Sequence, residues 1–229
     1  MKKKICLLFL SLFFISVSFS QDAASLLKQV KDKLDKVNDY EATGIMKTNV
    51  SFLKVPEASV TVYFKKPDNL KIKNDKGISL VPKGAVSLSL NKLLKGNFTA
   101  IDGGADVIQK VKIKIIKLLP VDDNADIVLS TLYIDESSLL ILKAKTTTKE
   151  SGTYEVEMSY GKYIPYALPD KVVFTFNIKD YKLPKGITFD YDDGSKKKTE
   201  NAMSDTKGKV EISYSSYIIN KGLPDTVFK

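Results

Sequence analysis

Alternating apolar and polar side chains give the clearest pattern in this chain at residues 59–73. The sequence Lys-Pro-Asp-Asn at residues 66–69 divides the alternation, and it suits a tight turn because Pro fixes φ while Asp and Asn tolerate turn geometry. Alternation of this kind places the apolar side chains on one face of each strand. We therefore expect a β-hairpin with one apolar and one Lys-rich face. Its apolar positions are Val60, Val62, Phe64, Leu70 and Ile72.

Residues 22–38, which precede the hairpin, have apolar side chains at helical spacing. Apolar side chains recur there every three or four residues with charged side chains between them, which predicts an amphipathic helix. Such a stripe has to bury itself against other apolar surface, and the concave face of a sheet is the nearest candidate. The apolar positions are Leu26, Leu27, Val30, Leu34 and Val37.

Most of the remaining chain has a period of two, which predicts many short antiparallel strands. Residues 107–119 fit both a strand and one face of a helix, and the alternation favours a strand over 110–119. We expect Asp102-Gly103-Gly104 to break the chain, residues 91–95 to form a helical turn and residues 190–205 to form a polar loop. The expected strands are residues 40–55, 78–81, 85–90, 127–135, 139–148, 153–160, 171–178 and 208–219.

One helix and a series of short strands predict a mainly β fold with α. The expected architecture is a curved antiparallel sheet or an open barrel, covered by the N-terminal helix. The register predicts which side chains face the interior, because a shift of one residue would reverse every side chain. Phe64, Phe174 and Phe176 should point inward, while Tyr63 and Thr175 should point outward.

The first 20 residues have the pattern of a secretory signal peptide. Three Lys precede an apolar run, and small residues lie before Gln21. Cleavage near Ser20/Gln21 would leave residues 21–229 as a single domain. An uncleaved membrane anchor is the alternative, which the three Ser residues in the run disfavour.

Composition excludes several kinds of chemistry. The chain has no His, and its only Cys lies in the signal segment, so the mature protein lacks the usual zinc ligands, Cys nucleophiles and His bases. Residues 122–126 resemble part of a calcium loop but lack its Gly and closing Glu. A catalytic Ser–Lys pair stays possible on composition, although no local sequence pattern indicates one. We expect a protein that is not an enzyme and has no metal and no cofactor.

The positive charge has no pattern typical of nucleic-acid binding. Signal cleavage removes three Lys and no acid, so the net charge falls from +9 to +6. The remaining Lys residues are spread along the strands, as expected for a solvated sheet face. For an exported protein, a membrane surface is a better anionic neighbour than nucleic acid.

The hairpin carries a family resemblance. The sequence Phe64-Lys65-Lys66-Pro67-Asp68-Asn69-Leu70, after an amphipathic helix and a long strand, resembles the opening of the LolA family of periplasmic lipoprotein carriers, and most of all its Bacteroidota-type members. The resemblance implies an incompletely closed barrel, covered by the N-terminal helix and short lid helices. The space between them would be an apolar cavity for acyl chains.

The resemblance implies a set of candidate cavity residues. The alternative for each is that it fills an ordinary core and binds nothing. Lys66 matches the basic residue that helps to control the covering elements in the family, although this chain has Lys where better-known carriers have Arg, which contacts anions differently. The candidate wall residues are Leu27, Val30, Leu34, Val60, Val62, Phe64, Leu70, Ile72, Leu88, Val156, Met158, Phe174 and Phe176.

The function implied by the resemblance is that of a periplasmic carrier. It would bind the acyl chains of lipoproteins and take them toward the outer membrane, as a monomer that meets an inner-membrane exporter and an outer-membrane acceptor transiently. Two alternatives stay open. One is an open-barrel sensor or interaction domain, and the other is a carrier of a different hydrophobic ligand, such as a glycolipid.

Overall fold

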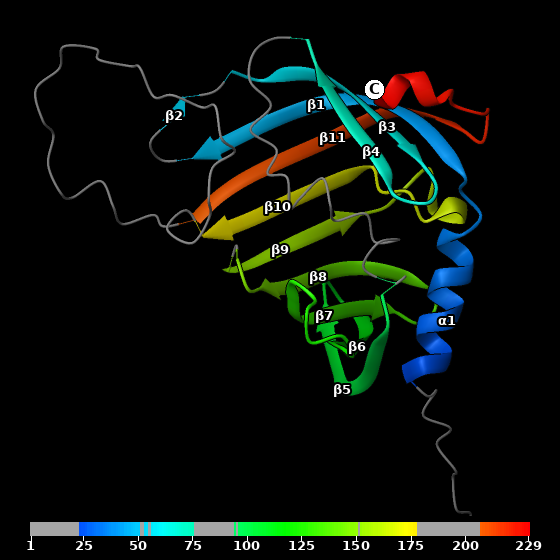
Figure 1. The fold of residues 1–229 in the computed structure, drawn as a ribbon, viewed down its shortest axis with the longest axis vertical. Helices are drawn as coiled ribbons and strands as arrows, with labels where there is room; N and C mark the ends of the chain where they lie inside the picture. Colours follow the sequence, from blue (N-terminus) through cyan, green and yellow to red (C-terminus); the bar gives the residue numbers. More distant parts are fainter. Residues whose placement is uncertain are drawn as a thin grey trace, which may run out of the picture.

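One curved antiparallel sheet forms the body of the protein in this computed structural model (Figure 1). The structure describes residues 23–50, 53–54, 56–75, 94, 96–150, 152–177 and 207–229. The helices with described bounds are the α-helix α1 (Ala23–Leu34) and the short 3-10 helices η1 (Ile164–Tyr166) and η3 (Asp225–Phe228). The strands are β1 (Asp39–Val50), β2 (Leu53–Lys54), β3 (Ala58–Lys65), β4 (Asn69–Asn74), β5 (Phe98–Ile108), β6 (Val111–Pro120), β7 (Ile127–Asp135), β8 (Leu140–Thr148), β9 (Gly152–Ser159), β10 (Lys171–Asn177) and β11 (Lys207–Ile219).

The strand order is nearly sequential. It runs β4-β3-β1-β11-β10-β9-β8-β7-β6-β5, and the two-residue β2 pairs back onto β1. Strand β11 is the exception, because it comes late in the chain and lies between β1 and β10. Within the described residues, β4 and β5 end the order without pairing to each other, so the sheet is open. This confirms the expected open, mainly β architecture.

Helix α1 lies at one end of the sheet, beside the ends of several strands (Figure 1). Leu26 and Val30 are fully buried in the main core, which the apolar stripe predicted. The predicted C-terminal end at residue 38 is wrong, since the helix ends at Leu34. Asn220 explains the early end: its side chain accepts a hydrogen bond from the Asn38 amide and donates one to the Lys36 carbonyl. A residue far along the sequence therefore satisfies the backbone that another helical turn would have used.

Two strand boundaries differ from the prediction. The first strand does not run through residues 40–55, because it stops at Val50 and the chain turns back to form β2. The expected break at Asp102-Gly103-Gly104 is also wrong, since these residues lie inside β5 at a register shift, where Gly104 has a φ of +91°. A bulge accommodates the glycine without ending the strand.

The ambiguous segment 107–119 is β, as the alternation favoured. It forms the end of β5, a turn and most of β6. The turn residues Gln109 and Lys110 both have positive φ, as a tight turn between twisted strands requires. The expected strands at 78–81 and 85–90, most of the helical turn at 91–95, the loop at 190–205 and the signal peptide lie outside the described residues.

The predicted inward faces are confirmed. Val60, Val62 and Phe64 are at most 3 % exposed, and Phe174 and Phe176 are also buried. Tyr63 and Thr175, on the opposite face of their strands, are partly exposed. The hairpin β3–β4 pairs Phe64 with Leu70 and Val62 with Ile72, so both strands present their apolar side chains to the same interior.

A β-bulge interrupts the pairing of β1 with β11. Thr43 pairs with Ser216 but Gly44 pairs with Tyr214, which leaves Ser215 as the extra residue on β11. Because one residue is extra, Tyr214 and Tyr217 both face the concave side of the sheet. A Cβ atom on Gly44 would collide with the carbonyl oxygen of Ser213, so the close approach of the two strands requires glycine.

We predict that Gly44→Ala destabilises the protein by about 1–3 kcal/mol, because the added methyl group forces apart the backbones at the bulge. Urea unfolding monitored by circular dichroism measures the change. Ser215→Ala is the matched control: it alters the exposed bulged residue without adding atoms to the tight contact, and should change stability by less than about 0.5 kcal/mol. Equal stability of the Gly44→Ala variant and the parent would contradict this account of the bulge.

Candidate functional site

An apolar cavity of about 170 Å³ lies over the concave face of the sheet, next to the C-terminal end of α1. Its wall comes from α1, both strands of the hairpin, the central strands and the segment around η1. None of the described residues that line it carries a charged side chain. Eight of the predicted wall residues line this cavity: Leu34, Val62, Phe64, Leu70, Ile72, Val156, Met158 and Phe174.

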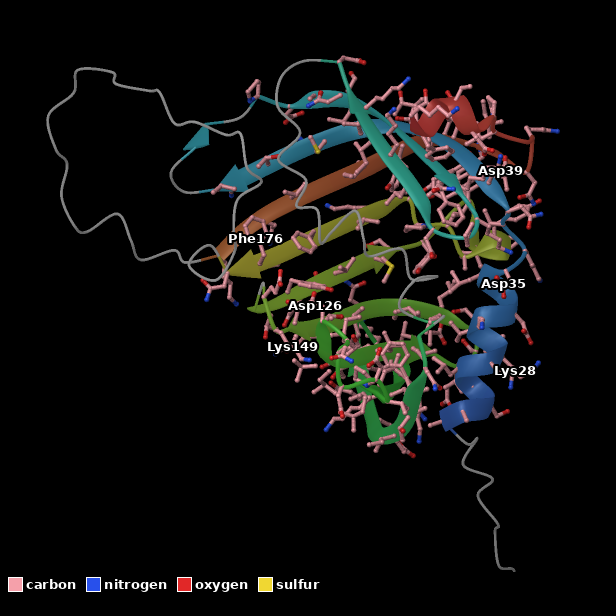
Figure 2. The ribbon with its side chains drawn as sticks, in the orientation of Figure 1. Lys28, Asp35, Asp39, Asp126, Lys149 and Phe176 are labelled. Atoms are coloured by element: carbon pink, nitrogen blue, oxygen red, sulfur yellow. The ribbon has the colours of Figure 1, made fainter. Side chains whose placement is uncertain are left out.

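Four other predicted wall residues do not line this cavity. Val30 and Val60 are buried in the main core, and Leu27 packs against that core from α1. Phe176 is also a core residue, and it lies at the opposite end of the sheet from Asp35 and Asp39, which mark the cavity end (Figure 2). Inward orientation on a strand thus does not decide whether a side chain reaches the cavity. The remaining candidate, Leu88, lies outside the described residues.

The sequence prediction missed an aromatic group on the cavity wall. Tyr40 stacks on Phe64 with ring centroids 5.3 Å apart, and Tyr217 contacts both Tyr40 and Tyr214 at 5.4 and 5.1 Å. These three tyrosines line the cavity. Strict alternation along β11 would put residues 214 and 217 on opposite faces. Their shared position on the cavity wall could therefore be predicted only if the bulge were known.

The segment after β9 closes another side of the cavity. It contributes Tyr166, Leu168 and Pro169 to the wall. Tyr217 fixes this segment to β11, since its hydroxyl donates a hydrogen bond of 2.7 Å to the Pro169 carbonyl oxygen. The Tyr217 amide donates to the hydroxyl of Tyr163, whose ring also contacts Tyr217. The wall here is held by specific polar contacts as well as by packing.

Tyr40, Tyr214 and Tyr217 of the cavity wall are neutral at ordinary pH. Burial raises the pKa of Tyr40, Tyr214 and Tyr217 above the usual value for a phenol, and the neighbouring Tyr214 raises the pKa of Tyr40 further. Each hydroxyl therefore keeps its proton and can donate a hydrogen bond. The chemistry that the site offers is apolar contact with a few neutral donors.

Lys66 joins two of the elements that cover the cavity. Its Nζ donates to the Asp35 carbonyl oxygen at 2.6 Å and lies 3.2 Å from Asp35 Oδ1. Lys66 begins the hairpin turn, and Asp35 is the first residue after α1. The predicted gating residue thus links the hairpin tip to the end of the helix. Because both side chains are partly exposed, such a link is weak enough to open.

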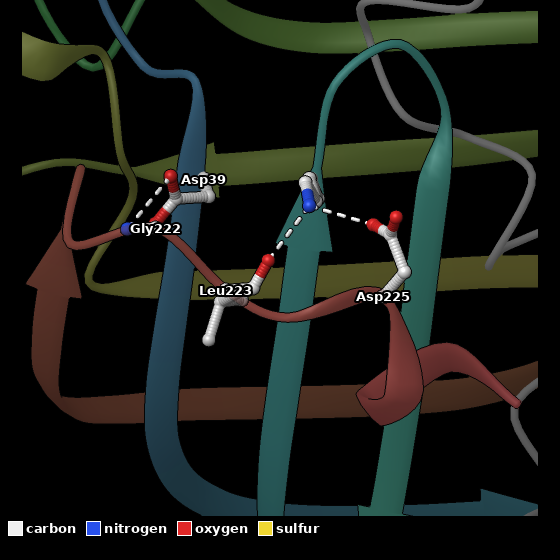
Figure 3. A network of polar contacts seen from close by, with 5 residues as sticks. Asp39, Gly222, Leu223 and Asp225 are labelled. Carbon is white, nitrogen blue, oxygen red and sulfur yellow. Dashed lines mark hydrogen bonds and ion pairs between the residues drawn. The ribbon is translucent and has the colours of Figure 1, made fainter.

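A second set of polar contacts fixes the segment between β11 and η3 (Figure 3). The buried Asp39 accepts hydrogen bonds from the Lys221 and Gly222 amides, each at 3.0 Å. Lys65 Nζ then donates to the Leu223 carbonyl oxygen at 2.7 Å and pairs with Asp225 at 2.6 Å. This segment therefore crosses β1 and β3 at a fixed position and supports the hairpin from outside.

Other charged groups of the described residues have structural roles. Glu155 and Glu157 pair with Lys143 on neighbouring strands. Among the residues searched, no cluster of three or more His, Cys, Asp or Glu side chains could hold a metal ion. The described part of the chain also contains no helix that combines the length and the apolarity needed to cross a membrane.

Comparison with known proteins identifies the fold. No protein-family profile matches the chain, and no curated protein matches its sequence. A solved domain from Vibrio parahaemolyticus, described as an outer membrane lipoprotein-sorting protein domain, aligns with 90% of this chain and 95% of its own at a TM-score of 0.56 and 12% identity. The fold is LolA-like.

Two further structures agree. A LolA superfamily protein from Nitrosomonas europaea covers 90% of this chain and 97% of its own, with a TM-score of 0.56 and 11% identity. A DUF1329 family protein from Desulfovibrio piger gives the same coverage and TM-score at 13% identity. At such low identity these likenesses establish the LolA-like fold, as the hairpin sequence predicted, and the fold alone.

We predict that two leucines of α1 respond differently to truncation. Leu26→Ala should lower stability by about 2–5 kcal/mol, because Leu26 is fully buried in the core. Leu34→Ala should cost less, because its side chain already borders empty space, and should change the affinity for a fluorescent fatty acid. Urea unfolding and fluorescence titration measure the two quantities. Equal stability losses with unchanged fatty-acid binding would show that Leu34 is an ordinary core residue.

Proposed function

We propose that this protein is a carrier that binds the acyl chains of a lipid or lipoprotein in its apolar cavity. The single observation that carries the proposal is a cavity whose described wall consists of aliphatic and aromatic side chains, with no charged one among them. An acyl chain needs no reactive group from its carrier, and burial of its methylene groups supplies the affinity. We accordingly propose binding without catalysis and without a cofactor or metal.

The volume of the cavity implies that its cover moves. An engineered apolar cavity of about 150 Å³ holds a molecule the size of benzene. The cavity of 170 Å³ is therefore too small for a complete lipid, whose chains need a pocket of several hundred Å³. The contact between Lys66 and Asp35 joins α1 to the hairpin turn, so its opening would let these two elements separate and enlarge the cavity.

The setting we propose is the periplasm. The N-terminal 20 residues have the pattern of a signal peptide, and similarly folded proteins include one described as a lipoprotein-sorting domain. The cargo would then be an acylated lipoprotein, received from an inner-membrane exporter and delivered to an outer-membrane acceptor by a monomeric carrier. The hairpin sequence at residues 64–70 supports a carrier of the Bacteroidota type.

The first experiment identifies the natural cargo. The protein is purified from its native host without detergent and its bound molecules are analysed by mass spectrometry, with a Phe174→Asp variant as the control. We expect acylated protein or lipid with the parent, and none with the variant, because an unpaired charge in the cavity wall excludes an apolar ligand or prevents folding. A glycolipid as the sole cargo would change the substrate class. A parent protein without any lipid, together with a partner-dependent signalling defect in a deletion strain, would favour the sensor alternative.

We predict that Lys66→Met accelerates ligand release. The substitution keeps the apolar stem and removes the ammonium group that holds the end of α1, so the dissociation rate of a fluorescent fatty acid should rise roughly two- to fivefold. Stopped-flow fluorescence measures the rate. Lys28→Met removes an exposed ion pair with Asp32 on the same helix and serves as the matched control, with an unchanged rate. Identical dissociation rates in the parent and the Lys66→Met variant would remove Lys66 from the release step.

A further inference from the structure

Two half-buried tyrosines of the cavity wall have hydroxyl groups without a hydrogen-bond partner among the described residues. Tyr40 on β1 and Tyr214 on β11 both line the cavity and both retain some exposed surface. Among the described residues, neither hydroxyl has a hydrogen-bond partner, although both rings take part in aromatic contacts. Neither hydroxyl is among the fully buried polar atoms that lack a partner, so both keep accessible surface and a ligand in the cavity can reach them.

Other buried tyrosines nearby show the contrast. Tyr217 lies between the pair and contacts both rings, but its hydroxyl is bound to the Pro169 carbonyl oxygen. The hydroxyl of Tyr160 is bound to the Ile141 carbonyl oxygen at 2.9 Å. The hydroxyls of Tyr217 and Tyr160 thus hold the wall together, whereas those of Tyr40 and Tyr214 make no hydrogen bond to the described residues.

The strand pairing places the side chains of Tyr40 and Tyr214 on the same face of the sheet. Tyr40 pairs with Ile219 and Tyr214 pairs with Gly44 on the same two adjacent strands, so both rings stand on the concave face. Without the bulge at Ser215, Tyr214 and Tyr217 could not share this face. The small residues Ala42 and Gly44, which lie opposite Tyr217 and Tyr214, leave room for the rings.

We propose that the hydroxyls of Tyr40 and Tyr214 form a polar subsite that binds the carbonyl oxygen of a neutral acyl ester or amide, and so positions the head of the chain inside the cavity. The inference rests on the proposed carrier function and adds the class of ligand head group to it. A carbonyl oxygen has two lone pairs and can accept from both phenols.

The carbonyl oxygen could belong to a neutral acyl ester or amide, or to the carboxylate of a free fatty acid, and the uncharged wall favours the neutral group. An acyl ester or amide is neutral, whereas a free fatty acid is an anion near neutral pH. Among the described lining residues there is no Lys to compensate a carboxylate, and burial of an uncompensated charge is costly. Burial also keeps both phenols protonated, as donors to a neutral acceptor. The subsite therefore fits the acyl group of a glycerolipid or of a lipid-modified protein better than a free fatty acid.

Three fluorescent probes with the same chain and label test the subsite. They are the methyl ester of pyrene-labelled decanoic acid, the free acid at pH 8, and decylpyrene, which lacks the carbonyl group. We expect the single variants Tyr40→Phe and Tyr214→Phe to weaken binding of the ester roughly two- to tenfold each, as the loss of one hydrogen bond implies. Binding of decylpyrene should stay within about twofold, because Phe preserves the apolar contacts. The parent should bind the free acid more weakly than the ester.

Tyr63→Phe is the matched control, since Tyr63 lies on the opposite face of β3 and should leave the affinity for each probe unchanged. If the parent binds decylpyrene and the ester, and both Phe variants bind the ester with the same affinity as the parent, the subsite is overturned and the carrier function stands. If the parent binds the free acid more tightly than the ester, and the Phe variants lose affinity for the acid alone, the assignment to a neutral ester is overturned. Failure of the parent to bind any of the three probes overturns the carrier function and the subsite with it.

Discussion

The structure depends on one constraint, namely that an open sheet with an apolar concave face must be covered by something other than its own strands. In a closed barrel the strands themselves would enclose the interior. Here β4 and β5 stay apart in the described part of the chain, so α1, the hairpin and the segment around η1 have to exclude water. These elements pack well enough to bury Leu26 and Val30, but they leave a space beside Leu34. The cavity lies where these described elements do not fill the concave face.

Polar contacts decide where the covering elements lie. Asn220 ends the helix, Asp39 holds the chain after β11, and Lys66 joins the helix end to the hairpin turn. These three contacts differ in how far they are buried, and the burial determines how easily each one breaks. Asp39 is only 7 % exposed and its hydrogen bonds are shielded from water, whereas the link from Lys66 to Asp35 is partly solvated. The arrangement therefore combines a firm frame with one contact that can break at little cost.

Sequence patterns predicted the parts of the structure that depend on local periodicity. The hairpin, the strands β6 to β11 and the inward side chains of β3 and β10 follow from alternation, which is a strong signal where one face of a strand is buried. The end of α1 could not be predicted, because Asn220 lies almost two hundred residues away in sequence and acts only after folding. The aromatic wall was missed for a similar reason: the bulge at Ser215 changes which residues share a face, and no local turn residue marks it. Within the candidate site, inward orientation was predictable, but membership of the cavity depended on where α1 and η1 pack.

The position of β11 has a consequence for how the chain reaches its final form. Strands β4, β3 and β1 come from the N-terminal part of the chain, while β5 to β10 form a meander of sequential neighbours. In the described part of the chain, the two groups of strands are joined only through β11, which pairs with β1 on one side and β10 on the other. Each group can pair locally as it is synthesised, yet the sheet stays in two pieces until residues 207–219 arrive. The wall that carries Tyr40 and Tyr214 lies at this junction, so the cavity is complete only when β11 has paired with both β1 and β10.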